Sequence, residues 1–252
     1  MSLLTFVVVN KDGTRTTYQN GCGWTHDTTS LAALEGNYDL LKFAHENGCE
    51  WRINTCYNAA LNGHLACLVY AHEHGCPWES FTCANAAMNN HMDCLIYARE
   101  NGCEWDFRAC TNAALGGHLN CLKYLHENGC DWSSDACRDA ALRGHLDCLK
   151  YLHENGCEWN TETCMIAACY GHLNCLQYAH ENGCEWNKET SLFAARLGHF
   201  DCLKYAYENG CEWSKQDWVL HLNANQTGTG IQTIADIQTH TDIRNYLDMQ
   251  NA

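Results

Sequence analysis

Cysteine and histidine are the residues of this sequence that could do chemistry, because both ligate zinc and cysteines can also pair as disulfides. The chain has 20 Cys and 15 His among 252 residues. Zinc motifs place paired ligands about two to four residues apart and bring four ligands together. Here Cys67 and Cys76 are nine residues apart, Cys76 and Cys83 are seven apart, and no C-x-x-C motif occurs. The spacing favours thiols that fill a core over the alternatives of a zinc site or disulfides.

The histidines form two regularly spaced rows. One row follows a Gly or Asn, where a ring nitrogen can hydrogen-bond a turn. In the other row, Arg99 and Tyr207 replace the histidine in two copies. A metal ligand or catalytic group would not survive this replacement in every copy, so we expect packing and hydrogen-bonding roles. The rows are His64, His91, His118, His145, His172 and His199, and His45, His72, His126, His153 and His180.

No residue set typical of an enzyme stands out. An active site needs a nucleophile beside a base, a carboxylate pair, or a glycine-rich phosphate loop. The segment "TGTG" from Thr227 follows no predicted strand and opens no predicted helix, so we interpret it as a loop. We therefore predict a protein that is not an enzyme and has no catalytic, cofactor-binding or metal-binding residues.

The elements that must position these residues repeat every 27 residues. Eight cysteines and eight of the nine tryptophans recur at this step. A fixed period of this kind is typical of repeat architectures. The two series are Cys22, Cys49, Cys76, Cys103, Cys130, Cys157, Cys184 and Cys211, and Trp24, Trp51, Trp78, Trp105, Trp132, Trp159, Trp186 and Trp213.

One copy, "NTCYNAALNGHLACLVYAHEHGCPW" from Asn54 to Trp78, predicts two short helices. We expect Thr55 to cap the first helix and Gly63 to end it in the left-handed conformation that glycine tolerates. A second helix should run from His64 to Gly75. Isolated helices below about 12 residues are marginal in water, so the copies must stack to build a core.

Recurring small and aromatic residues have predicted roles in this stack. An Ala pair such as Ala59 and Ala60 lets neighbouring helices approach closely. The Trp after each second helix should fill the seam between that helix and the first helix of the next copy, where a ring buries about 150–250 Å². The Cys two residues before each Trp is a compact filler, since free Cys is among the most buried residue types.

The pattern T-C-x-x-A-A-x-x-G-H-L-x-C-L-x-Y-x-x-E-N-G-C-x-W resembles the ankyrin repeat, whose AA, GH and closing G correspond to Ala59, Ala60, Gly63, His64 and Gly75. The unit is 27 residues long rather than about 33, which implies that the projecting β-hairpin of ordinary ankyrins is cut to a short turn. This short Cys- and Trp-rich form is similar to repeats in expanded families of giant DNA viruses and protists.

The predicted fold class is an all-α, ankyrin-like solenoid of about seven helix-turn-helix repeats without long β-hairpins. Residues 1–24 are predicted as an N-terminal β-hairpin cap, because β-branched runs flank the turn signal Asp12-Gly13. Residues 25–213 hold the seven repeats. Residues 214–252 are predicted as a degenerate eighth repeat and a C-terminal cap.

Charge and composition restrict the partners and the compartment. A formal net charge of −15 argues against nucleic acid, which clustered Lys and Arg bind. The chain has no secretory signal pattern and no run of eighteen apolar residues, so we predict no membrane partner and a reduced, cytoplasmic location. For a viral source this means the host cytoplasm or the virion.

Repeat solenoids bind other macromolecules through surfaces that vary over a constant frame. We predict a scaffold or adaptor for a protein partner, which is a host factor if the source is viral. The alternative is a structural subunit that self-associates end to end or laterally in a filament or coat. The ankyrin resemblance implies a concave binding face, and the candidates there are Arg52, Phe81, Phe107, Arg108, Arg143, Tyr170 and Arg196.

Overall fold

The structure is a computed structural model that describes residues 5–9, 15–19, 27–159, 161–212 and 245. The chain divides into two compact units, Met1–Asp131 and Trp132–Ala252. In the described residues, the first unit holds two strands and eight helices, and the second holds six helices. None of the described helices is long and apolar enough to cross a membrane.

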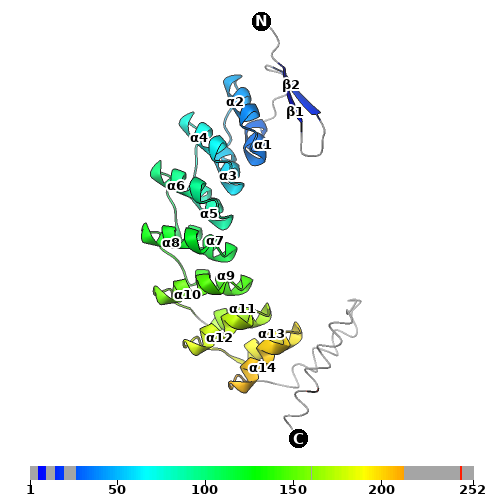
Figure 1. The fold of residues 1–252 in the computed structure, drawn as a ribbon, viewed down its shortest axis with the longest axis vertical. Helices are drawn as coiled ribbons and strands as arrows, with labels where there is room; N and C mark the ends of the chain where they lie inside the picture. Colours follow the sequence, from blue (N-terminus) through cyan, green and yellow to red (C-terminus); the bar gives the residue numbers. More distant parts are fainter. Residues whose placement is uncertain (1–4, 10–14, 20–26, 160, 213–244, 246–252) are drawn as a thin grey trace. The chain divides into compact units, whose positions relative to one another are not determined.

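Helices come in pairs along both units (Figure 1). The second helix of each pair begins 27 residues after the previous one, at the step found in the sequence. The first unit contains α1 (Thr28–Glu35), α2 (Tyr38–Glu46), α3 (Asn54–Leu61), α4 (Leu65–Glu73), α5 (Ser80–Met88), α6 (Met92–Glu100), α7 (Phe107–Gly116) and α8 (Leu119–Glu127). The second unit contains α9 (Asp135–Arg143), α10 (Leu146–Glu154), α11 (Thr161–Cys169), α12 (Leu173–Glu181), α13 (Lys188–Arg196) and α14 (Phe200–Glu208).

Glycine follows most of the first helices in a left-handed conformation, as predicted, and Asn90 takes this place after α5. Gly63 has φ of +71°, and the amides after α3 turn back, with Gly63 N–H donating to Ala60 O and His64 N–H to Ala59 O at 3.3 and 2.8 Å. This pattern satisfies the last carbonyls of the helix. The prediction that Thr55 caps this helix was wrong, because α3 begins at Asn54 and Thr55 lies buried inside its first turn. There its hydroxyl bonds that of Thr29 on α1, at 3.4 Å.

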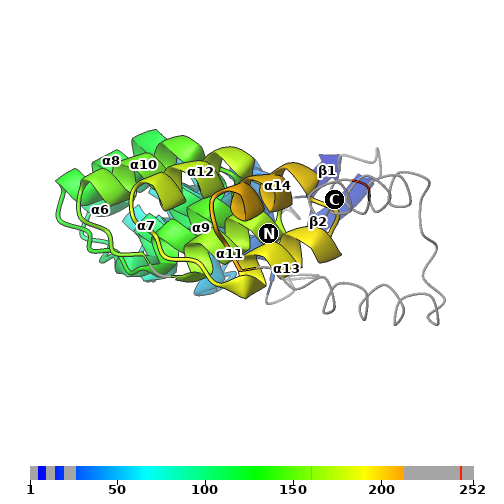
Figure 2. The same cartoon turned by 90° about the horizontal axis from the view of Figure 1, so that it is seen from below.

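The core of each unit lies between stacked helix pairs. In the first unit α1, α3, α5 and α7 pack in succession, and α2, α4 and α6 form a parallel row. Figure 2 shows the same two rows in the second unit, with α10, α12 and α14 in one row and α9, α11 and α13 in the other. The all-α solenoid predicted from the sequence is confirmed.

Small and branched residues fill this core by position. The described Ala pairs on the first helices, such as Ala59 and Ala60, are fully buried, which lets neighbouring first helices approach closely. Each second helix contributes a fully buried leucine, and burying such a side chain stabilises a fold by about 1.5–3 kcal/mol. The leucines are Leu41, Leu68, Leu95, Leu122, Leu149, Leu176 and Leu203.

The N-terminal residues contain a pair of antiparallel strands. β1 (Thr5–Val9) pairs with β2 (Arg15–Gln19) in a register that runs from Thr5 opposite Gln19 to Val9 opposite Arg15, and β1 lies against α2. The Asp12-Gly13 turn lies outside the described residues, and a capping role for the strands stays a prediction. The predicted eighth repeat and C-terminal cap in residues 214–252 also lie outside the described residues, apart from Asn245.

Candidate functional site

The cysteines fill the core and tie the repeats together. Every described cysteine is free, and all except the half-buried Cys169 are buried. In five repeats the thiol two residues before the Trp donates to a backbone carbonyl 24 residues earlier, as from Cys76 Sγ to Arg52 O at 3.5 Å and from Cys103 Sγ to Glu79 O at 3.4 Å. Each such bond joins one repeat to the turn before it, so the predicted packing role is confirmed.

Burial makes a second set of thiols, those inside the second helices, poor nucleophiles. It raises the pKa of Cys67 to about 11, of Cys94 to about 12 and of Cys121 to about 11. A thiol with such a pKa carries little reactive thiolate near neutral pH. Within the described ranges, no group of three or more His, Cys, Asp or Glu side chains could hold a metal ion.

The first histidine row packs on the glycine turns of the preceding repeat. His172 places Nε2 3.1 Å from Leu142 O, at the end of the first helix one repeat earlier. A Cβ added to Gly63 would lie 2.4 Å from Nδ1 of His91, so only glycine leaves room for that ring. Burial lowers the pKa of His199, and a hydrogen bond to the Cys169 backbone partly opposes this. These histidines are structural joints between neighbouring repeats.

The second histidine row stacks on the tryptophans. The rings of His72 and Trp78 are 3.6 Å apart and nearly parallel, at 10°. In the following repeat, the guanidinium of Arg99 takes the place of the imidazole, 4.1 Å from the Trp105 centroid. An imidazole and a guanidinium therefore both suit this position.

The predicted position of the tryptophans was wrong. Each described Trp is only partly buried and packs edge-to-face against a tyrosine of the next second helix, as Trp78 does against Tyr97 at 6.2 Å. It does not fill the seam beside the next first helix. The fully buried Ala pairs lie on the first helices, which pack on one another in succession.

The seven candidate residues divide between two ends of the first helices. Arg52, Phe81, Phe107 and Arg108 lie at or just before helix starts in the first unit, and Arg143, Tyr170 and Arg196 lie at or just after helix ends in the second. Exposed hydrophobic groups gather at the helix starts, where Ile53, Phe81 and Phe107 are 56%, 44% and 47% exposed.

Phe81 and Arg108 are brought together. The Arg108 guanidinium lies 4.1 Å from the centroid of the Phe81 ring. Asp106 holds that guanidinium through a bond from Nε at 2.9 Å, and Nη2 donates to Ser80 Oγ at 3.2 Å. The hydrogen bond from Arg108 lowers the pKa of Asp106, so the carboxylate stays charged near neutral pH. Arg108 and Phe81 therefore form a fixed cation–π pair.

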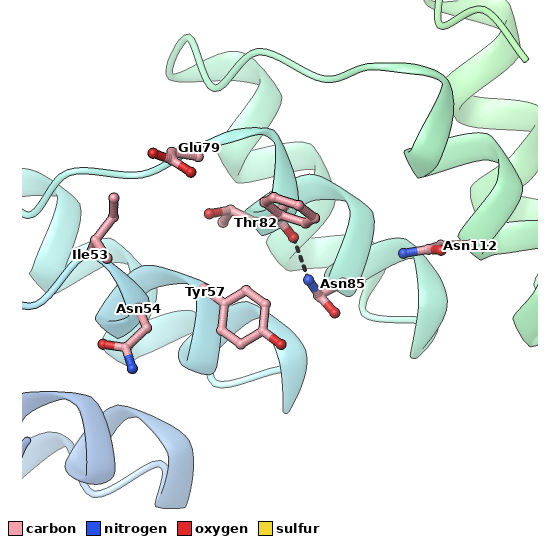
Figure 3. Close-up of a pocket in the computed structure, with 8 residues that line it drawn as sticks. Ile53, Asn54, Tyr57, Glu79, Thr82, Asn85 and Asn112 are labelled. Carbon is pink, nitrogen blue, oxygen red and sulfur yellow. Dashed lines mark hydrogen bonds between the residues drawn. The ribbon is translucent and has the colours of Figure 1, made fainter.

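A cavity of about 440 Å³ opens beside this pair in the first unit (Figure 3). Figure 3 shows Tyr57 of α3 facing Thr82 and Asn85 of α5, with Asn112 of α7 beyond them. Its lining is mainly apolar and amide, and only Glu79 among its residues is charged. The lining residues are Ile53, Asn54, Tyr57, Glu79, Phe81, Thr82, Asn85 and Asn112.

The remaining candidates are more scattered. Arg52 forms an ion pair with Asp27 at 3.6 Å. In the second unit, Arg143 and Tyr170 line a cavity of about 430 Å³ together with Leu142 and His172. Arg196 lies 5.9 Å from the Phe193 ring.

Most of the residues that line the cavity beside Phe81 were not predicted from the sequence. Tyr57 and Glu79 look unremarkable in the chain, but the asparagines carry a signal. Asn58, Asn85 and Asn112 each precede an Ala pair at the 27-residue step. Asparagine is a poor helix former, so its recurrence inside a helix indicates a specific hydrogen-bonding role.

Comparison with known proteins identifies the class to which this solenoid of helix pairs belongs. A family model described as "Ankyrin repeats (3 copies)" matches residues 83–163 and 137–217, together more than half of the chain. The chain belongs to the ankyrin repeat family. A comparison with curated proteins finds no match.

Among solved structures, the crystal structure of the human ASB11 ankyrin repeat domain is similar at 19% sequence identity. That match covers 77% of this chain and 96% of that chain, with a TM-score of 0.42. Ankyrin repeat domains generally mediate protein–protein interactions and are typically non-enzymatic.

Proposed function

We propose that this chain is a scaffold or adaptor that binds a protein partner through the first-helix starts of its first unit. The observation that carries the proposal is the cluster of large exposed apolar side chains around a cavity, on a frame that otherwise repeats. Exposed apolar patches beside polar rims mark interaction sites, and aromatic and Arg side chains supply most of the binding energy at interfaces.

The Arg108 side chain suits this role because it is already ordered. Its bonds to Asp106 and Ser80 fix the guanidinium over Phe81. A partner that packs on this pair loses little side-chain entropy, since the groups are held in place before binding.

The compartment and the kind of partner form part of the same proposal. Nineteen described cysteines are free, and eighteen of them are buried, which suits a reducing environment such as the cytoplasm. The 27-residue Cys- and Trp-rich unit supports membership of the short ankyrin type of giant viruses and protists, with a host protein as partner.

Affinity capture with the full chain tests the proposal. The variant Phe81→Ser/Phe107→Ser removes two exposed rings and should reduce capture of a partner at least about tenfold. Leu197→Ser is the matched control, because Leu197 is 55% exposed and lies in the second unit. Equal capture by the double variant and the control would contradict the proposal. Sedimentation at high concentration checks the structural-subunit alternative, which requires large oligomers.

A further inference from the structure

The cavity lies beside one of three asparagines, Asn58, Asn85 and Asn112, that occupy the same position in successive first helices. Asn58 Nδ2 donates to Ser30 O at 3.2 Å and Ser30 Oγ at 2.8 Å, and Asn112 Nδ2 donates to Ala84 O at 3.3 Å. All three bonds reach back 28 residues, to the preceding first helix. Asn85 occupies the same register, but its Nδ2 donates to Phe81 O of its own helix at 2.7 Å (Figure 3). Asn85 therefore does not reach Tyr57, and space opens between them.

The lining of this space suits one apolar side chain and a stretch of peptide backbone. Its volume of about 440 Å³ falls within the usual range of ligand pockets, about 300–1,000 Å³. Ile53, Tyr57 and Phe81 supply apolar walls. The amides of Asn54 and Asn112 carry both donors and acceptors, which can pair with the N–H and C=O groups of an incoming chain.

The charges around the cavity are mostly negative. Arg108 is the one charged side chain on α3, α5 and α7, and Asp106 neutralises it. Arg52 pairs with Asp27. Glu79 lines the cavity and is exposed, and Glu104 is exposed on the next turn.

Those two turns are neighbours, because the Cys103 thiol contacts the backbone carbonyls of both glutamates, Glu79 and Glu104. No ion pair of either glutamate is found in the described part of the chain. The apolar cavity therefore has an uncompensated acidic rim.

We infer that the cavity binds an apolar side chain of a partner segment in which that side chain is flanked by lysine or arginine. The apolar walls bury the central side chain, and Glu79 and Glu104 attract the flanking cations. The inference rests on the proposed function and adds to it the chemistry of the partner.

Labelled peptides and the full chain test this pairing. The first peptide has a central leucine with two lysines on each side. In the second a serine replaces the leucine, and in the third glutamates replace the lysines. Burial of one leucine is worth about 1.5–3 kcal/mol, so the serine peptide should bind about tenfold or more weakly. The glutamate peptide should show no measurable binding. Equal binding of the leucine and serine peptides would overturn the inference, because charge alone would then explain it.

Two variants and one spectroscopic signal locate the peptide. Phe81→Ala removes a wall and should weaken binding of the leucine peptide, whereas Leu197→Ala is the control, since Leu197 is also exposed but lies in the second unit. Glu79→Gln should weaken binding about twofold to fivefold at low salt, as expected for an exposed ion pair. In the unmodified chain, the methyl signal of Ile53 should shift on peptide addition and that of Ile96 on α6 should not. An unchanged Ile53 signal, or equal effects of Phe81→Ala and Leu197→Ala, would overturn the inference.

Failure here is distinguishable from failure of the proposed function. If the Phe81→Ser/Phe107→Ser variant loses its captured partner while the leucine peptide does not move the Ile53 signal, the surface binds a protein of other chemistry. If capture is also unchanged, the surface has no binding role.

Discussion

Replacement of Gly63 by alanine should destabilise its repeat more than replacement of Gly75 in the same repeat does. Both glycines have positive φ, +71° and +83°, so an alanine at either position is strained. The surroundings differ. A Cβ on Gly63 would lie 2.4 Å from His91 Nδ1, whereas nothing lies within 4 Å of a Cβ on Gly75. The pair therefore separates backbone strain from the contact between repeats.

The two costs can be worked out from these contacts. A left-handed alanine is disfavoured by roughly 1–2 kcal/mol relative to glycine, which sets the cost at Gly75. At Gly63 the His91 ring must also move by about 1 Å to reach an ordinary contact distance of about 3.5 Å. Overpacking of this kind costs about 1–3 kcal/mol more. In a His91→Ala background, the additional cost at Gly63 should disappear.

Hydrogen exchange suits this measurement better than a global melt, because long repeat arrays depart from two-state unfolding. Amides of α3 and α4 report the free energy of local opening in the repeat that contains both glycines. We expect Gly63→Ala to reduce protection there more than Gly75→Ala does. If the two variants lose equal protection, or if His91→Ala does not relieve Gly63→Ala, the histidine joint does not hold the repeats as described.

Three further results are expected. Under native alkylation followed by mass spectrometry, Cys169 should react first, because Cys67 is buried with a pKa raised to about 11; early labelling of Cys67 would contradict this. Arg99→Ala should lower the free energy of unfolding, measured with denaturant, by about 0.5–1 kcal/mol. Arg99→His should lower it less, since histidine stacks on the equivalent tryptophans. Partial burial lowers the pKa of His45, His72 and His199 in the folded state, so their contribution to stability is full above about pH 6.5 and falls as the pH drops through that value. A melting temperature that stays flat from about pH 7.5 to 5.5 would refute this reasoning, which rests on His45, His72 and His199.

The helix pairs could be predicted because their signals are local and repeat. Gly63 needs a left-handed conformation whatever surrounds it, and Ala59 and Ala60 imply a close neighbour whatever its identity. A 27-residue step then places the same requirement in every copy. Burial of the thiols could be predicted from the same 27-residue period, because a residue type that recurs in every repeat has a structural role.

The position of the tryptophans could not be read from spacing alone. Trp78 lies close in sequence to the next first helix, α5, which favoured that helix as its contact. The structure instead stacks the indole on His72 and sets its edge against Tyr97 of the next second helix. Proximity in sequence predicts contacts within one repeat. Contacts between repeats depend on how the whole repeats stack.

The cavity depends on a choice that the sequence does not express. Asn58, Asn85 and Asn112 are identical in type and register, yet two of them bond the preceding helix and Asn85 bonds its own. The difference arises from the residue 28 positions earlier, on the preceding first helix. Asn85 faces Tyr57 there, whereas Asn58 faces Ser30 and Asn112 faces Ala84. A bulky ring in place of a small side chain favours the turn of Asn85 toward Phe81 O, and the unmade link leaves the space that an incoming side chain can fill. The proposed binding surface therefore depends on Asn85, whose hydrogen bond changes where the variable Tyr57 faces it.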